Sequence, residues 1–130
     1  MNISEIEFDS DLTMDINIDQ QQQSIILEIS DSLTVSEEEL QISFKQKIAN
    51  FINSSKTWYP LSIERIFNED GKQAKPKLMT IYVLSEQNVN SIIFGLLFRV
   101  EIDIEHGRGL KMDGETLKIL EYGTAEVSFS

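Results

Sequence analysis

The residues best equipped for chemistry stand together in one short stretch, Asp-Ile-Glu-His-Gly-Arg-Gly, over residues 103–109. A histidine beside a carboxylate can act as a general base with an orienting partner, and imidazole with carboxylates also suits a transition metal. Glycines at the same place favour a turn, because glycine adopts positive φ without strain. The segment is therefore a candidate catalytic site, metal site or structural turn, and its relevant residues are Asp103, Glu105, His106, Gly107 and Gly109.

Residue types and spacing favour the structural turn. On a regular strand His106 points away from Asp103 and Glu105, and the chain has no second histidine and no cysteine to complete a metal site. A nucleophile elbow, a phosphate loop and a dinucleotide fingerprint are all missing from the sequence. We expect His106 to pin the turn by a hydrogen bond, and at least one glycine to have positive φ. The sequence thus predicts no catalytic residue, no metal and no cofactor.

Charge is distributed very unevenly along the chain. The 130 residues hold 22 acids against 11 lysines and arginines, a net charge of −11, and residues 1–44 hold 11 of the acids and no base. Binding to a phosphate backbone needs a basic surface, so nucleic acid is an unsuitable partner. A basic protein is a suitable one, because opposite charges steer association.

Two stretches of this acidic third alternate apolar and polar residues, which is the period of a half-buried strand. The alternation covers residues 11–19 and 25–29, and the glutamines at 20–23 are predicted to form the hairpin loop between them. Like charges on one strand face cost stability, so a solvent face rich in acids is not explained by folding alone. The acids expected to share this face and to bind a partner are Asp11, Asp15, Asp19 and Glu28.

One long amphipathic helix is predicted over about residues 36–54. Ser36 and Glu39 form a capping box, and the following apolar residues recur at the spacing of a single buried stripe. Pro60 is expected to prevent further helix. The later part of the chain predicts strands over residues 61–67, 77–84, 91–105 and 125–130, and a hairpin that turns at Asp113-Gly114.

The segment 86–98 also fits helical spacing, so its type stays open between helix and strand. From Phe98 onward the alternation is clear and predicts that Ile102 and Ile104 face the core.

The order of strands, one long helix and further strands predicts an α+β fold with a mostly antiparallel sheet, in a single domain over residues 1–130. The N-terminus lacks the basic and apolar regions of a signal peptide, and the longest apolar run, 92–98, is too short to cross a bilayer. We therefore expect a cytoplasmic protein that does not bind membranes.

The stretches FGLLFRVEIDIEHGRGLKM and ILEYGTAEVSF, about residues 94–129, resemble the C-terminal half of a group of small, uncharacterised bacterial proteins. In these proteins a hydrophobic strand precedes D-x-E-H-G-x-G, and the group includes suspected immunity proteins of bacterial toxin systems. The matching positions are Asp103, Glu105, His106, Gly107, Gly109 and Gly123. The group's tryptophan before the aspartate is replaced by Ile102, and the acidic third lies outside the resemblance.

Charge and resemblance together predict a non-enzymatic interaction protein. The expected activity is that of an immunity protein, which binds and neutralises a basic toxin domain through its acidic face. Two alternatives remain open: a small metal- or histidine-dependent enzyme centred on Asp103, Glu105 and His106, and a regulatory module with another partner. The sequence does not predict the oligomeric state.

Overall fold

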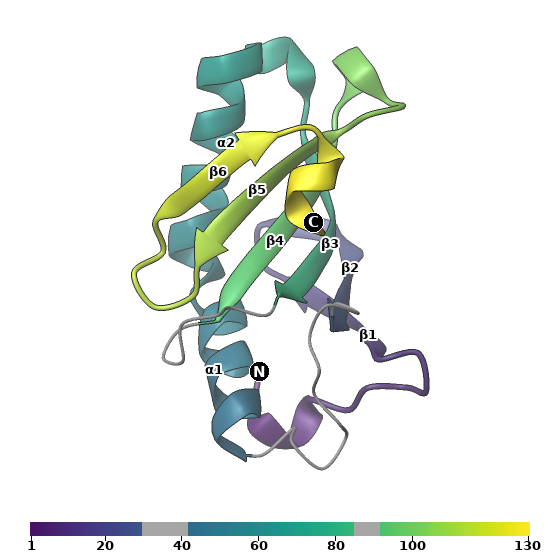
Figure 1. Ribbon diagram of the computed structural model, residues 1–130, viewed down its shortest axis with the longest axis vertical. Helices are drawn as coiled ribbons and strands as arrows, with labels where there is room; N and C mark the ends of the chain where they lie inside the picture. Colours follow the sequence, from purple (N-terminus) through teal and green to yellow (C-terminus); the bar gives the residue numbers. More distant parts are fainter. Residues whose placement is uncertain (30–41, 85–91) are drawn as a thin grey trace.

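Within the residues described by the computed structural model, 1–29, 42–84 and 92–130, six strands form one sheet in chain order (Figure 1). The strands are β1 (Thr13–Ile18), β2 (Gln21–Ile29), β3 (Lys77–Leu84), β4 (Ile93–Arg99), β5 (Arg108–Asp113) and β6 (Ile119–Gly123). The pair β2–β3 is parallel, and the other neighbours are antiparallel. The predicted α+β class with a mostly antiparallel sheet is confirmed.

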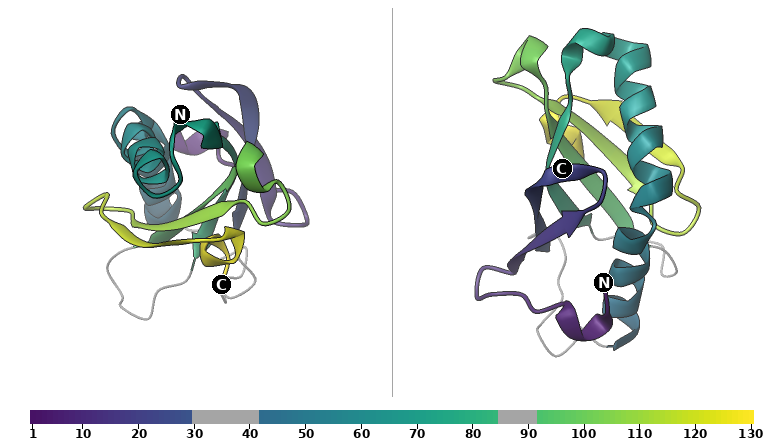
Figure 2. Two further views of the ribbon diagram at one scale, coloured as in Figure 1. Left: turned by 90° about the horizontal axis from the view of Figure 1, so that it is seen from above. Right: turned by 180° about the vertical axis from the view of Figure 1, so that it is seen from behind.

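Two helices, α1 (Ile42–Asn53) and α2 (Ser55–Asp70), connect β2 to β3 and cover one face of the sheet (Figure 2). Aromatic rings join the two layers, because Phe51 stacks on Phe94 of β4 at 3.8 Å between centroids and on Trp58 of α2 at 4.9 Å. The Trp58 indole also donates a hydrogen bond of 2.6 Å to the carbonyl of Phe51. The same carbonyl also accepts a bond of 2.9 Å from the amide of Ser54, so two donors fix the backbone at the junction of the helices.

Two predictions about residues 60–67 were wrong: Pro60 does not prevent further helix, and residues 61–67 are helix instead of strand. Helix α2 continues through Pro60 to Asp70, and its buried residues Trp58, Ser62 and Ile66 recur at helical spacing. Proline removes the hydrogen bond to the carbonyl four residues earlier, which belongs to the exposed Lys56, so water can satisfy that group. Where one helix was predicted, the described residues thus contain two, α1 within the predicted range and α2 after it. The start of the predicted helix, 36–41, lies outside the described residues.

The predicted strand 91–105 ends at Arg99, so the expectation that Ile102 and Ile104 face the core was wrong. These side chains are 44% and 59% exposed. Strand β5 returns along β4 with Arg108 opposite Phe98, which forces the chain to turn between them. The turn contains a 3₁₀ helix, η4 (Glu101–Asp103). In the open segment 86–98, residues 93–98 are strand, and 85–91 lie outside the described residues.

The predicted strand at 125–130 is instead a 3₁₀ helix, η5 (Ala125–Ser128), on the face of the sheet opposite α1 and α2 (Figure 2). It packs closely on β4 and β5 because both strands carry glycine there. A Cβ on Gly95 would lie 1.7 Å from the carbonyl oxygen of Ser128, and one on Gly109 would lie 2.8 Å from the Ser128 nitrogen. A segment packed on the face in this way does not pair as a seventh strand.

The two predicted hairpins are present with different turns. Strands β1 and β2 are joined at Asp19-Gln20, and Gln21, Gln22 and Gln23 belong to β2 rather than to a loop. The β5–β6 connection spans residues 114–118, and the Asp113 carboxylate accepts bonds from the amides of Glu115 and Thr116. Short 3₁₀ helices also occur at Ile3–Glu5 and Lys72–Ala74. No helix in the described ranges is long and apolar enough to cross a membrane.

Candidate functional site

The segment 103–109 forms the turn that brings the chain from β4 back into β5. Gly107 has φ of +60°, as expected for at least one of the two glycines, and its amide donates a hydrogen bond of 2.9 Å to the carbonyl of Asp103. Gly109 has no positive φ, and its role is to leave room for the backbone of η5. The carbonyl of His106 accepts a bond of 2.9 Å from the amide of Ala125, which ties the turn to the C-terminal segment.

The turn redirects His106 toward Asp103, although the two would point apart on a regular strand. The Nδ1 atom of His106 lies 2.9 Å from Oδ1 of Asp103, and its backbone amide donates to the same oxygen at 3.4 Å. The hydrogen bond to Asp103 raises the pKa of His106, and the charge of Glu105 raises it further. Reciprocally, hydrogen bonds from His106 and Arg108 lower the pKa of Asp103. Glu105 itself points to solvent.

Arg108 connects this turn to the end of α2. Its Nε and Nη2 atoms donate bonds of 2.9 and 3.2 Å to the two carboxylate oxygens of Asp70, and Nη1 donates to Asp103 at 3.1 Å. Nη1 also donates to the carbonyl of Gly107 at 2.6 Å. The hydroxyl of Tyr122 on β6 donates a further bond to Asp70. We call Asp70, Asp103, Arg108 and Tyr122 the ionic cluster.

The ionic cluster is largely shielded from water and internally satisfied. The side chains of Arg108 and Asp70 are only 15% and 19% exposed. Hydrogen bonds from Arg108 lower the pKa of Asp70, and burial together with the bond to Asp70 raises the pKa of Tyr122. Each charged group is held in its ionised form by a neighbour. This arrangement joins the end of α2, the η4 turn and β6.

Sequence reasoning missed Asp70, Arg108 and Tyr122. Arg108 lies within the motif. Asp70 is 38 residues before Arg108 and Tyr122 is 14 residues after it, in segments predicted only as a turn and a strand. No spacing rule links positions so far apart. The one available signal was that an arginine between two glycines needs a countercharge when it is buried.

The side chains of the turn are arranged to hold its structure more than to react with a substrate. His106 is exposed, and the cluster carboxylates are already occupied by Arg108 and Tyr122. Among the residues described, no group of three or more histidine, cysteine, aspartate and glutamate side chains is placed to hold a metal ion. The hydrogen bond and the positive φ that the turn interpretation requires are both present.

The four predicted partner-binding acids lie around the β1–β2 hairpin, but Asp11, Asp15 and Asp19 do not share one strand as predicted. Only Asp15 lies within β1, because Leu12 with φ of +60° turns the chain after Asp11, and Asp19 belongs to the hairpin turn. Glu28 is opposite Thr13 and therefore shares the face of Asp15. Asp11, Asp15 and Asp19 are exposed, and in the described part of the chain their carboxylates make no hydrogen bond or ion pair.

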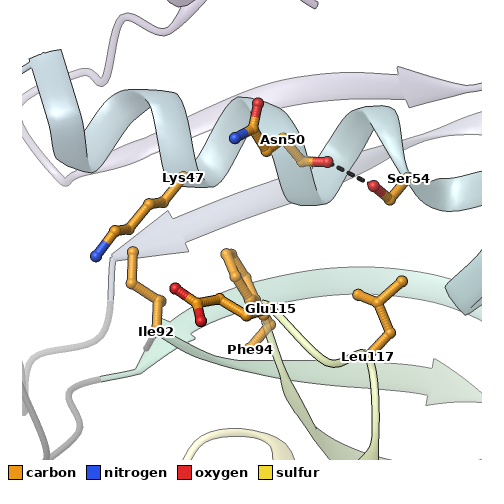
Figure 3. Close-up of a pocket in the computed structure, with 8 residues that line it drawn as sticks. Lys47, Asn50, Ser54, Ile92, Phe94, Glu115 and Leu117 are labelled. Carbon is orange, nitrogen blue, oxygen red and sulfur yellow. Dashed lines mark hydrogen bonds between the residues drawn. The ribbon is translucent and has the colours of Figure 1, made fainter. Parts of the chain in front are cut away.

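A pocket of about 400 Å³ lies between α1 and the β5–β6 connection, at the opposite end of the sheet from the ionic cluster (Figures 1 and 3). Lys47 and Asn50 line it from α1, Ser54 lines it from the junction between α1 and α2, and Phe94 and Glu115 line it from the sheet side. The Ser54 hydroxyl is engaged with the carbonyl of Asn50 at 2.8 Å. Among the described lining residues no histidine or cysteine stands beside that hydroxyl, so this pocket does not present an activated nucleophile.

The chain was compared with protein families, curated proteins and solved structures. No family model, no curated protein and no solved structure matches the chain.

Proposed function

We propose that this protein is a non-enzymatic binding protein, of the immunity type, that recognises a basic protein domain through the acidic β1–β2 hairpin. A toxin that acts on nucleic acid is a suitable partner, because such a domain needs a basic surface to hold phosphates. An acidic binder covers that surface and gains association rate from opposite charge. The resemblance of residues 94–129 to suspected immunity proteins agrees with this proposal but does not include the hairpin.

The observation that supports the proposal is that the carboxylates of Asp11, Asp15 and Asp19 lack a partner among the described residues. These three residues are exposed, and in the described part of the chain their carboxylates make no hydrogen bond or ion pair. Elsewhere in the structure acids do meet bases, as in Arg65–Glu69, Lys75–Glu101 and Lys111–Glu121. Solubility explains a high net charge. It does not explain why residues 1–44 contain no lysine or arginine at all.

The enzyme alternative has less support from the geometry. It requires a reactive centre at Asp103, Glu105 and His106, and there Asp103 is committed to His106 and Arg108 while Glu105 points to solvent. The pocket at α1 is at the far end of the sheet and is not lined by these residues.

We expect a toxin-like protein to be encoded directly upstream of this chain's gene. The test is association kinetics with its basic domain, measured by biosensor at two salt concentrations. The variant carries Asp11→Lys, Asp15→Lys and Asp19→Lys. A matched control carries Glu64→Lys, Glu115→Lys and Glu126→Lys, which change the net charge equally on other surfaces. At low salt we expect the hairpin variant to associate about tenfold more slowly than the control, with the difference shrinking as salt rises. Equal rates for the two variants would reduce the acidic hairpin to a solubility feature.

A further inference from the structure

Within the described residues, protein covers the sheet face opposite the helices over β4 and β5. The 3₁₀ helix η5 packs on β4 and β5 at Gly95 and Gly109, on the side of the sheet away from α1 and α2 (Figure 2). Beside this covered part the same face carries exposed apolar side chains. Ile26 of β2 and Phe129 after η5 are each 44% exposed.

Tyr82 of β3 adds an aromatic ring to this face. The Tyr82 ring meets the Phe129 ring edge to face at 5.6 Å between centroids. Ile26 is opposite Thr80 in the parallel β2–β3 pair, so Ile26, Thr80 and Tyr82 lie on one face. We call Ile26, Tyr82 and Phe129 the apolar face. Aromatic residues are enriched at the centres of protein interfaces, and exposed apolar groups that lie together commonly mark them.

Acids border the apolar face on the hairpin side. Asp15 is directly opposite Ile26 in the β1–β2 pair, and Glu28 is directly opposite Tyr82 in the β2–β3 pair. The bases on this side of the sheet lie away from Asp15 and Glu28. Lys77 and Arg99 are opposite each other at the start of β3 and the end of β4, and Lys111 of β5 forms an ion pair with Glu121. An apolar centre with an acidic border fits a partner that combines apolar side chains with lysine or arginine.

We infer that the apolar face is the anchoring centre of the surface through which the acidic hairpin holds its partner. The occupant is a segment of a basic protein in which apolar residues alternate with lysine or arginine. The inference rests on the proposed function and adds where the partner is held. A second copy of this chain is a poorer occupant, because facing copies would bring Asp15 and Glu28 of each near the same acids of the other. An anionic membrane is disfavoured by the same charges.

The experiment uses a synthetic peptide of defined chemistry, Lys-Phe-Lys-Phe-Lys-Phe-Lys, titrated into the full chain and followed by amide chemical shifts. Two further peptides separate the contributions: one replaces each phenylalanine by serine, and the other replaces each lysine by glutamate. We expect the Lys-Phe peptide to shift the amides of Ile26, Tyr82 and Phe129. The serine peptide should bind at least about fivefold more weakly, and the glutamate peptide should not bind at all.

Variants then locate the contact. Phe129→Ala and Ile26→Ala should each weaken binding of the Lys-Phe peptide about fivefold or more. Leu120→Ala on β6 and Leu61→Ala on α2 remove comparably exposed apolar side chains and should leave it unchanged. Shifts centred elsewhere, or equal affinities for all four variants, would overturn the inference. So would a dimer in sedimentation that Phe129→Ala abolishes, because the occupant would then be a second copy.

The outcomes also separate this inference from the proposed function. Suppose that reversing Asp11, Asp15 and Asp19 slows association with the toxin-like protein while Phe129→Ala leaves its dissociation unchanged. The proposed role of the acidic hairpin is then supported, and the inference that the apolar face anchors the partner is wrong. If charge reversal has no effect on that association, the proposed function itself fails, whatever the peptide does.

Discussion

Arg108 donates hydrogen bonds of 2.9 and 3.2 Å to the two carboxylate oxygens of Asp70, a residue 38 positions earlier in the chain. A fork of this kind fixes orientation as well as distance, because the guanidinium and the carboxylate are both planar. Arg108 opens β5, and Asp70 ends α2. The pair therefore holds the helical layer to the turn that the motif builds.

Removing the Asp70 charge should destabilise the fold. In Asp70→Asn the guanidinium of Arg108 stays shielded but loses its main countercharge, and we expect a loss of about 2–3 kcal/mol in the free energy of unfolding. The neighbouring substitution Glu69→Gln breaks only the exposed Arg65–Glu69 pair and should cost less than about 0.5 kcal/mol. Urea unfolding of the two variants measures the contrast. Equal stabilities would mean that the ionic cluster does not hold α2 in place.

Periodicity along the sequence predicted the elements whose structure depends on local pattern. The β1–β2 hairpin alternates as expected, with Ile16, Ile25 and Leu27 buried. The errors came where tertiary contacts decide. Residues 61–67 are helix because Trp58, Ser62 and Ile66 form one buried stripe, and that stripe cannot be seen once Pro60 is taken as a helix stop.

The turn of the candidate site could be predicted from the sequence, but the residues that contact Arg108 from other elements could not. Glycine at 107 and histidine at 106 indicated a pinned turn from residue types alone, and Gly107 does have positive φ. Asp70 contacts Arg108, and Tyr122 contacts Asp70, only because α2 and β6 end beside the turn. Such a contact depends on the arrangement of three elements, which no local spacing encodes.

A side chain at Gly107 should be costly for two reasons. Its φ of +60° strains a β-branched residue, and a Cβ there would lie 2.8 Å from the carbonyl oxygen of Phe98. Gly107→Val should therefore lower the free energy of unfolding by more than about 1 kcal/mol. Ser24→Val places the same side chain at an exposed position of β2, where valine is well tolerated, and is the control. A Gly107→Val protein that melts like Ser24→Val would contradict the turn argument.

The isoleucines of the η4 turn should contribute little to stability, against the prediction from alternation. Ile102→Ser and Ile104→Ser remove side chains that already face water, and each should change the free energy of unfolding by no more than about 0.5 kcal/mol. Leu96→Ala, in the buried face of β4, should cost about 2–5 kcal/mol. Thermal unfolding of the three variants compares them. A large loss from either isoleucine would place it in the core after all.

His106 allows the pinned turn to be tested by titration, because it is the single histidine and its ring signals are unambiguous in NMR spectra. The hydrogen bond to Asp103 raises its pKa above the ordinary value of 6.5 in the folded protein. A raised pKa means that protonated His106 stabilises the fold. This contribution is complete below pH 6.5 and disappears as the pH rises through the higher folded pKa.

We therefore expect Asp103→Asn to return the pKa of His106 toward 6.5. Glu105→Gln should lower it less, because Glu105 acts only through its charge. The stability difference between the wild type and His106→Ala should be larger at pH 5.5 than at pH 8.5, with partner affinity per folded molecule unchanged. If the pKa is at or below 6.5, or is insensitive to Asp103→Asn, the turn is not pinned by this bond. A stable His106→Ala protein that has lost a measurable activity would instead favour a catalytic role for the motif.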